Sequence, residues 1–409
     1  MRVLFVAGLL FWASLAALLP VLPLYVQSMG ANSQTVGIVV GSFAIGLLAS
    51  RPALARMADR RGRKLVLLIG MVTVAIAPIG YIATQSIPLL IVVRAFHGLS
   101  IAAFALAYSA LIVDLSPPQR RGELIGYMSL VNPIGMGLGP AIGGFMQSWV
   151  GYVPTFWTAA ALGIVGLVFT IQVQDVYLPT HATAATGAIA ASGTGSDQFW
   201  LKLLQPHIRT PALVLLLVGV AFGTLTTFVP LLVVEVGVNL NVGLIYSAAA
   251  IASFGIRLLV GRASDYYGRG LFITGSLVLY ALSMAVLWRA SSTAGFLVAG
   301  LLEGCGSGIL IPMMAVLMAD RSQPHERGLT FSLCMVGFDL GIALAGPFFG
   351  AIAIQLNYQT IFGLASLLSW LGLLVFLIFS GKNMSQSLRF ALGKGKDIYA
   401  VEPATQTYK

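Results

Sequence analysis

Five ionisable residues lie well within long apolar stretches of the chain: Arg94, His97, Glu303, Asp339 and, nearer the end of its stretch, Arg257. A charge in the hydrocarbon region of a bilayer is costly, so residues of this kind usually bind a solute or carry a proton. A buried acid can gain or lose a proton as its exposure and charged neighbours change. Glu303 is therefore the first candidate for a proton carrier and Asp339 the second, with Arg94 and His97 as cavity partners that modulate it. The alternatives are a neutral Glu303 hydrogen-bonded within the helices, an Asp339 that serves the interface between two halves of the chain, and an Arg94 side chain that extends to the membrane surface.

Apolar helices must position these residues. Hydrophobic residues make up 58% of the 409 residues and charged residues only 9%, with a mean hydropathy of +0.92. So few charges could not cover the surface of a soluble protein. Runs of roughly 20 apolar residues are long enough to cross a bilayer as helices. We expect an all-α polytopic membrane protein with twelve transmembrane helices, near 4–26, 36–55, 65–84, 88–113, 123–146, 155–175, 210–234, 243–262, 271–289, 294–319, 329–355 and 358–380.

The sequence repeats itself with an offset of 206 residues. Residues 55–67 recur as residues 261–273, each copy between two apolar runs. The pairs that keep this offset are Arg51/Arg257, Arg56/Arg262, Asp59/Asp265, Gly62/Gly268, Arg63/Arg269, His97/Glu303 and Asp114/Asp320, while Asn132/Asp339 differ by 207. Because each half has an even number of spans, both halves begin on the same side of the membrane. The repeat predicts two pseudosymmetric six-helix bundles, as in secondary transporters.

Composition and charge divide the chain into four parts. A tract rich in Ala, Thr, Gly and Ser begins a flexible linker at 179–209, which separates a bundle at 1–178 from a bundle at 210–381 and a tail at 382–409. Of the 23 Lys and Arg residues, all but Arg94 and Arg289 fall on or near the face that carries the linker. The positive-inside rule makes that face cytoplasmic, with both termini, in an inner or plasma membrane. The basic excess is thus topological and predicts no nucleic-acid partner.

Residues 55–67 resemble the loop motif between spans 2 and 3 of the major facilitator superfamily, G-x-L-A-D-R-x-G-R-K-x-x-L. Ala55 and Met57 replace the Gly and the Leu of the motif. The resemblance implies a gating loop that latches the two halves on the inner side in the outward-open state. A basic loop that only sets topology is the alternative. The predicted gating residues are Arg56, Asp59, Arg60, Gly62, Arg63, Lys64, Asp265, Gly268 and Arg269.

Two further segments carry the same resemblance. Arg94 to Gly98 resembles the fourth-span motif R-x-x-Q-G, with His97 in the position of the Gln. Span 5 matches G-x-x-x-G-P-x-x-G-G, which resembles the antiporter motif of drug–proton exporters. The residues that match it are Gly135, Gly139, Pro140, Gly143 and Gly144. Small residues allow close helix approach, so a plain packing interface is the alternative.

These patterns predict a secondary active transporter that exports small amphiphilic molecules, including cationic ones, by proton-coupled alternating access. A proton symporter or facilitator for sugars or other metabolites is the alternative, and a membrane receptor or enzyme on a transporter scaffold is more remote. No HExxH, CxxC or GxSxG motif and no nucleotide-binding loop is present, which argues against an enzyme. The expected partners are a small-molecule substrate, protons and the lipid bilayer, with no cofactor or metal, and the expected state is a monomer.

Overall fold

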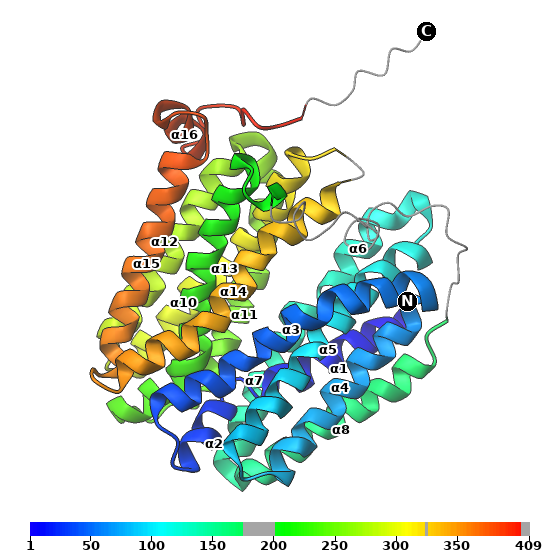
Figure 1. Ribbon diagram of the computed structural model, residues 1–409, viewed down its shortest axis with the longest axis vertical. Coiled ribbons are helices and arrows are strands. Elements are labelled where there is room, and N and C mark those ends of the chain that lie inside the picture. Colours follow the sequence, from blue (N-terminus) through cyan, green and yellow to red (C-terminus); the bar gives the residue numbers. More distant parts are fainter. Residues whose placement is uncertain (175–200, 324–325, 402–409) are drawn as a thin grey trace.

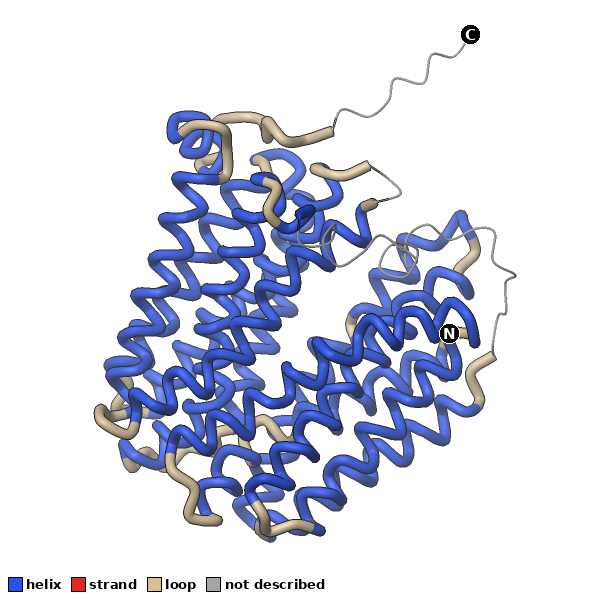
Figure 2. Tube along the Cα trace, in the orientation of Figure 1, coloured by secondary structure: helices blue, strands red, loops and turns tan. Residues whose placement is uncertain are grey.

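The computed structural model describes residues 1–174, 201–323 and 326–401, and it shows helices and no strand among them. Figures 1 and 2 show the helices in two bundles, α1 to α8 and α10 to α16. The first bundle comprises α1 (Arg2–Ala17), α2 (Leu22–Ser28), α3 (Ser33–Arg61), α4 (Arg63–Ala83), α5 (Ile87–Leu115), α6 (Arg121–Ser129), α7 (Val131–Val150) and α8 (Tyr152–Ile171). The second comprises α10 (Pro206–Val236), α11 (Gly243–Tyr267), α12 (Arg269–Arg289), α13 (Thr293–Asp320), α14 (Arg327–Ala353), α15 (Tyr358–Phe379) and α16 (Met384–Ala391).

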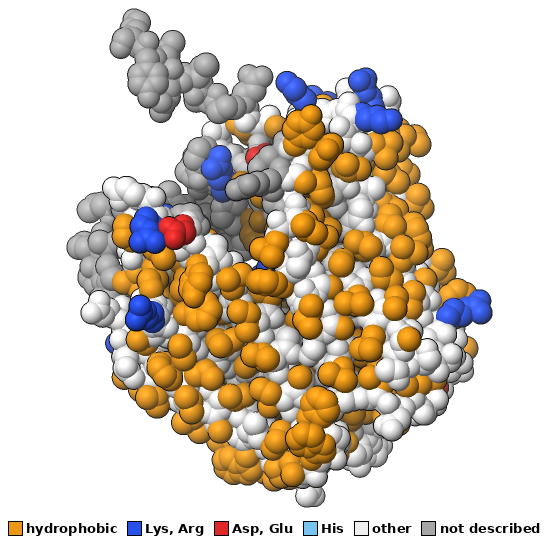
Figure 3. Space-filling view, turned by 180° about the vertical axis from the view of Figure 1, so that it is seen from behind, with side chains coloured by type: hydrophobic (Ala, Val, Ile, Leu, Met, Phe, Trp, Pro, Cys, Tyr) orange, Lys and Arg blue, Asp and Glu red, His pale blue; other side chains and the backbone are white. Residues whose placement is uncertain are grey.

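The helices confirm the predicted all-α polytopic membrane fold. Eleven helical segments of the described chain are long and apolar enough to cross a membrane, with α1 and α2 counted as one. Helix α7 is the remaining predicted span, and its glycines and prolines lower its hydropathy although it packs between α1 and α11. Hydrophobic side chains cover most of the outer face in Figure 3, as expected of a surface in contact with lipid.

Proline interrupts two of the predicted spans. The first span breaks into α1 and α2 at a turn that contains Pro20, and Pro23 lies in the first turn of α2. The span predicted at 123–146 is divided into α6 and α7 at Leu130. Pro133 lacks the N–H that would bond the carbonyl of Ser129, so the helix loses a hydrogen bond at this point. The membrane-length part of this span therefore begins at Val131, later than predicted.

The two bundles contact each other mainly through α3 with α14 and α7 with α11, and α10 also contacts α2 and α3. Ser33 Oγ lies 2.8 Å from Tyr358 Oη, and Ser247 Oγ donates to the carbonyl of Gly137 at 2.6 Å. Gly37 lies so close to Gly346 that an added Cβ would collide with the Gly346 carbonyl. These contacts all lie away from the end where α8 finishes and α10 begins, which we call the linker end. The bundles are therefore closed together at one end and spread at the linker end (Figure 1).

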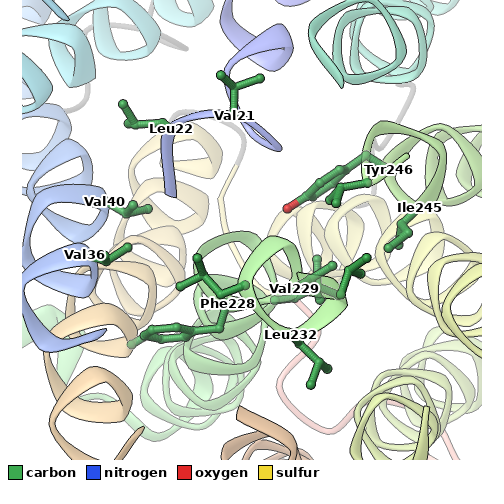
Figure 4. Close-up of a cluster of buried hydrophobic side chains, with 14 of the residues drawn as sticks. Val21, Leu22, Val36, Val40, Phe228, Val229, Leu232, Ile245 and Tyr246 are labelled. Carbon is green, nitrogen blue, oxygen red and sulfur yellow. The ribbon is translucent and has the colours of Figure 1, made fainter. Parts of the chain in front are cut away.

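A hydrophobic cluster closes the end opposite the linker end. It joins side chains of the first bundle to side chains of the second within one buried group (Figure 4). The labelled members are Val21, Leu22, Val36, Val40, Phe228, Val229, Leu232, Ile245 and Tyr246. Each of them is at most 9% exposed, so the cluster excludes water. We call this group the apolar seal.

The segment after α15 folds back onto the linker end of the second bundle. Helix α16 packs against α12 and α15. The buried Arg321 side chain donates from Nε to Asp397 Oδ2 at 2.7 Å and also donates to the carbonyls of His207 and Ser380. One guanidinium thus connects α13, α10, the end of α15 and the segment beyond α16. The described part of the predicted tail is therefore packed on the bundle as far as residue 401.

Candidate functional site

A cavity of about 430 Å³ lies between the bundles. Helices α1, α3, α5 and α7 line it on one side, and α10, α11, α13 and α14 line it on the other. Most lining residues are aliphatic or aromatic, and the charged ones are Arg51, Arg94, Arg257, Glu303 and Asp339. An apolar cavity with a few convergent polar groups is the form expected of a small-molecule site.

Glu303 belongs to this cavity and has no counter-charge among the residues that the structure describes. Its residue is 4% exposed on α13, and Tyr280 of α12 and Ser307 lie close to the carboxyl group. The Glu303 Oε1 and Tyr280 Oη atoms have no hydrogen-bond partner. Within the described residues, Glu303 forms no ion pair. A buried carboxyl group in this position is costly as an anion and readily neutralised by a proton.

Arg94 lines the opposite wall, whereas His97 lies behind it. Arg94 is 7% exposed, and its guanidinium carbon lies 4.5 Å from the centre of the Phe43 ring. Arg94 Nη1 is 3.4 Å from His97 Nδ1, which is 3.0 Å from Tyr81 Oη. His97 is fully buried and does not line the cavity. The two residues lie side by side, but Arg94 alone of this pair faces the solute space.

Asp339 is ion-paired across the bundle interface. Its Oδ2 atom lies 2.6 Å from Arg51 Nη1, which links α14 to α3. In the internal repeat, Arg257 corresponds to Arg51 and Asn132 corresponds to Asp339. Arg257 and Asn132 both line the cavity. The counterpart of the Arg51–Asp339 ion pair therefore has an amide in place of the carboxylate. Arg257 Nε has no hydrogen-bond partner among the described residues. Sequence reasoning assigned no role to Arg51, although the matched pairs Arg51/Arg257 and Asn132/Asp339 were the signal for this crossed arrangement.

The duplicated hairpins adopt the same backbone form at the linker end. Gly62 joins α3 to α4 with φ +96° and ψ 153°, and Gly268 joins α11 to α12 with φ +87° and ψ 146°. Glycine alone accepts this region without strain. Each following arginine pairs with an acid near the end of the next span: Arg63 with Asp114, and Arg269 with Asp320 at 3.5 Å. The repeat is therefore structural as well as sequential.

The remaining predicted gating residues are less constrained in this structure. Arg56 is exposed and donates from Nε to the carbonyl of Pro52 at 3.2 Å, Arg60 is exposed and Lys64 is partly exposed. The side chains of Asp59 and Asp265 lie outside what the structure describes. The hairpins lie at the spread end of the bundles, where a latch between halves would be open.

The glycines of the predicted antiporter motif form two faces of α7. An added Cβ at Gly139 or Gly143 would collide with α1, at Ala13 and Ala17 respectively. On the other face, the Pro140 carbonyl lies against Gly243 of α11, and Gly144 lies against Asn241. Gly135 also faces α1, at Trp12. The motif thus packs α7 within its own bundle and forms part of the contact between bundles.

No group of three His, Cys, Asp or Glu residues that could hold a metal ion is found in the described chain. Both cysteines, Cys305 and Cys334, are free. Among the described residues, the site offers a solute-sized cavity, one unpaired acid, one ion pair between bundles and two arginines without carboxylate partners. This is the chemistry of binding and protonation.

Comparison with known proteins supports this interpretation. The family model of the Major Facilitator Superfamily matches residues 4–275 and 239–397. Quinolone resistance protein NorA of Staphylococcus aureus is 25% identical over 350 residues, which cover 83% of this chain and 87% of the relative. An uncharacterized MFS-type transporter of Salmonella typhimurium is 25% identical over 87% of this chain and 89% of its own length. A crystal structure of the nucleoside transporter NupG superposes with a TM-score of 0.75 at 15% identity, covering 92% of this chain and 98% of that one. The chain therefore belongs to the Major Facilitator Superfamily and is a multi-pass membrane transporter, not an enzyme.

Proposed function

We propose that this transporter exports small amphiphilic molecules in exchange for protons. The observation that carries the proposal is Glu303, an acid without a counter-charge in the cavity between the bundles. Similarity to a quinolone resistance protein and the glycine motif of α7 support the direction of transport. We further propose that the protein acts as a monomer in the plasma membrane, with the linker end in the cytoplasm.

With that orientation, the structure represents the inward-facing state. The apolar seal and the glycine contacts of α3 with α14 and α7 with α11 close the outer end. Alternating access requires these contacts to separate while the linker ends approach. The hairpins at Gly62 and Gly268 are then in position to meet the opposite bundle. Asp59→Asn should therefore slow transport while substrate binding measured without a gradient stays largely intact.

Proton coupling follows if substrate and proton compete for Glu303. On the outer side, protonation neutralises the carboxyl group and releases the substrate. On the inner side, where the proton concentration is lower, Glu303 loses its proton. A bound substrate then compensates the negative charge of the buried carboxylate. Because an empty, charged Glu303 is costly in a closed cavity, the bundles interconvert mainly with one of the two ligands bound. This produces exchange without covalent chemistry.

Proteoliposomes with imposed proton gradients test the proposal. Substrate accumulation in the compartment with the higher proton concentration supports exchange. Accumulation of the same solute in the compartment with the lower proton concentration would instead establish a symporter. Transport that ignores the gradient would establish a facilitator and refute proton coupling.

A further inference from the structure

Two buried charges of the cavity, which form no ion pair with a described residue, have opposite signs and lie on opposite walls. Arg94 of α5 belongs to the first bundle and Glu303 of α13 to the second. Each is more than nine-tenths buried, and Arg94 Nε and Glu303 Oε1 both lack hydrogen-bond partners. The two side chains form no ion pair with each other or with any other described residue. The cavity thus contains a separated positive and negative site.

The other charges do not cancel these two. Arg51 and Asp339 neutralise each other in their ion pair. Arg257, on the wall of the second bundle, is half-buried and has an unpartnered Nε, which adds positive charge without adding an acid. A solute with only a positive charge would satisfy Glu303 but would leave Arg94 buried and uncompensated.

We propose that the substrate is a zwitterionic amphiphile whose anionic group binds Arg94, whose cationic group faces Glu303 and whose aromatic or aliphatic body packs against the apolar lining. This inference rests on the proposed exchange of solute for protons and specifies its substrate class. The Arg94 guanidinium lies against the Phe43 ring in the cavity wall, and a guanidinium is the side-chain group best suited to bind a carboxylate. Trp12 and Phe338 add apolar lining on the two sides.

The arrangement also explains why solute and proton compete. The cationic group compensates Glu303 only while its carboxyl group is ionised, so a proton at Glu303 removes that attraction. The positive charge of Arg94 makes the cavity unfavourable for a solute that is only a cation. The anionic group of a zwitterion neutralises that charge. Both bundles then hold the solute, one by each charge, which couples its presence to the relative position of the bundles.

Three fluorescent probes separate the two charges. Nε-dansyl-L-lysine is a zwitterion, dansylcadaverine is the same molecule without its carboxylate, and 6-(dansylamino)hexanoic acid is the same molecule without its amine. Binding to purified transporter in lipid nanodiscs, without any gradient, is measured by dansyl fluorescence. We expect the zwitterion to bind about tenfold more tightly than either singly charged probe, the size of effect that one charge-assisted hydrogen bond produces.

Variants at the two walls should have opposite effects. Arg94→Gln should remove the advantage of the zwitterion over dansylcadaverine, and Glu303→Gln should remove its advantage over the hexanoic acid. Arg94→Lys, which keeps the charge, should retain part of the first advantage. Arg289→Gln, which alters an exposed arginine stacked on Trp288, is the matched control and should change neither.

The wild-type ranking alone can overturn the proposal, even if a variant fails to fold. Dansylcadaverine bound as tightly as the zwitterion, or no measurable binding of the zwitterion, contradicts it. So does an equal loss of all three probes in Arg94→Gln. Because no gradient is applied, the ranking can hold while proton-driven transport fails, in which case the coupling is wrong and the substrate class stands.

Discussion

Glu303 is the acid of the cavity that has no counter-charge in the described structure, and Arg94 and Arg257 likewise have no carboxylate partner there. Asp339 has a counter-charge in Arg51, at 2.6 Å across the bundle interface. The two acids are therefore placed for different tasks. We propose that Glu303 exchanges a proton or a ligand and that Asp339 stabilises the contact between bundles.

Glu303→Gln keeps the size of the side chain and removes its titration. We expect proton-driven transport to be lost while downhill exchange of substrate continues, because the cavity keeps its shape. Proton movement in proteoliposomes on addition of substrate is the measurement. Glu123→Gln, at an exposed acid paired with Arg120 on α6, is the control and should retain coupling. Wild-type proton movement in Glu303→Gln would remove this residue as the carrier.

The Arg51–Asp339 ion pair predicts a charge-swap effect. Arg51→Asp and Asp339→Arg should each lower stability by about 1–3 kcal/mol, because each leaves a like-charged pair in a largely buried position. The double variant should recover most of the loss. Thermal unfolding in detergent measures all three. A double variant no more stable than the single variants would show that the two side chains do not interact in solution.

At the scale of helices, glycines set how closely the bundles can approach. Gly37 of α3 and Gly346 of α14 bring the two backbones into direct contact, and Gly243 of α11 brings another backbone against Pro140 of α7. Without side chains at these positions, the helices pack closely enough for the apolar seal to form. In the proposed mechanism, the same contacts must open on the outward transition.

Gly37→Ala should disfavour the closed outer end, since its Cβ would collide with the Gly346 carbonyl. We expect slowed transport and an apolar seal that opens more often. Val229→Cys, introduced in a background without Cys305 and Cys334, reports this opening by labelling with an impermeant thiol reagent from outside. Gly275→Ala is the matched control, because an added Cβ there meets nothing within 4 Å. Equal labelling in the two glycine variants would refute the role assigned to the α3–α14 contact.

At the scale of the whole molecule, the charge bias predicts that the linker and the C-terminal segment face the cytoplasm. Cysteines introduced at Ser192 and at Ser385, which is exposed on α16, should be protected from an impermeant thiol reagent added to intact cells. Both should react once the cells are permeabilised. Labelling of either site in intact cells would reverse the orientation and make the structure outward-facing.

The sequence by itself determined the features that arise from local patterns. Apolar run length predicted the spans, because each helix must satisfy its own backbone within the bilayer. The 206-residue offset predicted two like bundles, and the structure shows the duplicated corners at Gly62 and Gly268 with the same positive φ. Because a buried charge is costly, the positions of Glu303 and Asp339 within apolar stretches predicted both as candidate proton carriers. The division of one span at Leu130 was missed, although Pro133 was a local signal for it.

Tertiary structure alone decided which of these residues meet. Ser33 with Tyr358, Gly37 with Gly346 and Arg51 with Asp339 are each roughly 300 residues apart, and only the packing of the two bundles brings them together. It also separated Arg94, which faces the cavity, from His97, one turn along the same helix, which is turned away toward Tyr81. Helical periodicity shows that a residue lies on a given face, but it does not show which neighbour covers that face. Nor could the sequence select the state that is closed opposite the linker end, because both states of an alternating transporter use the same helices.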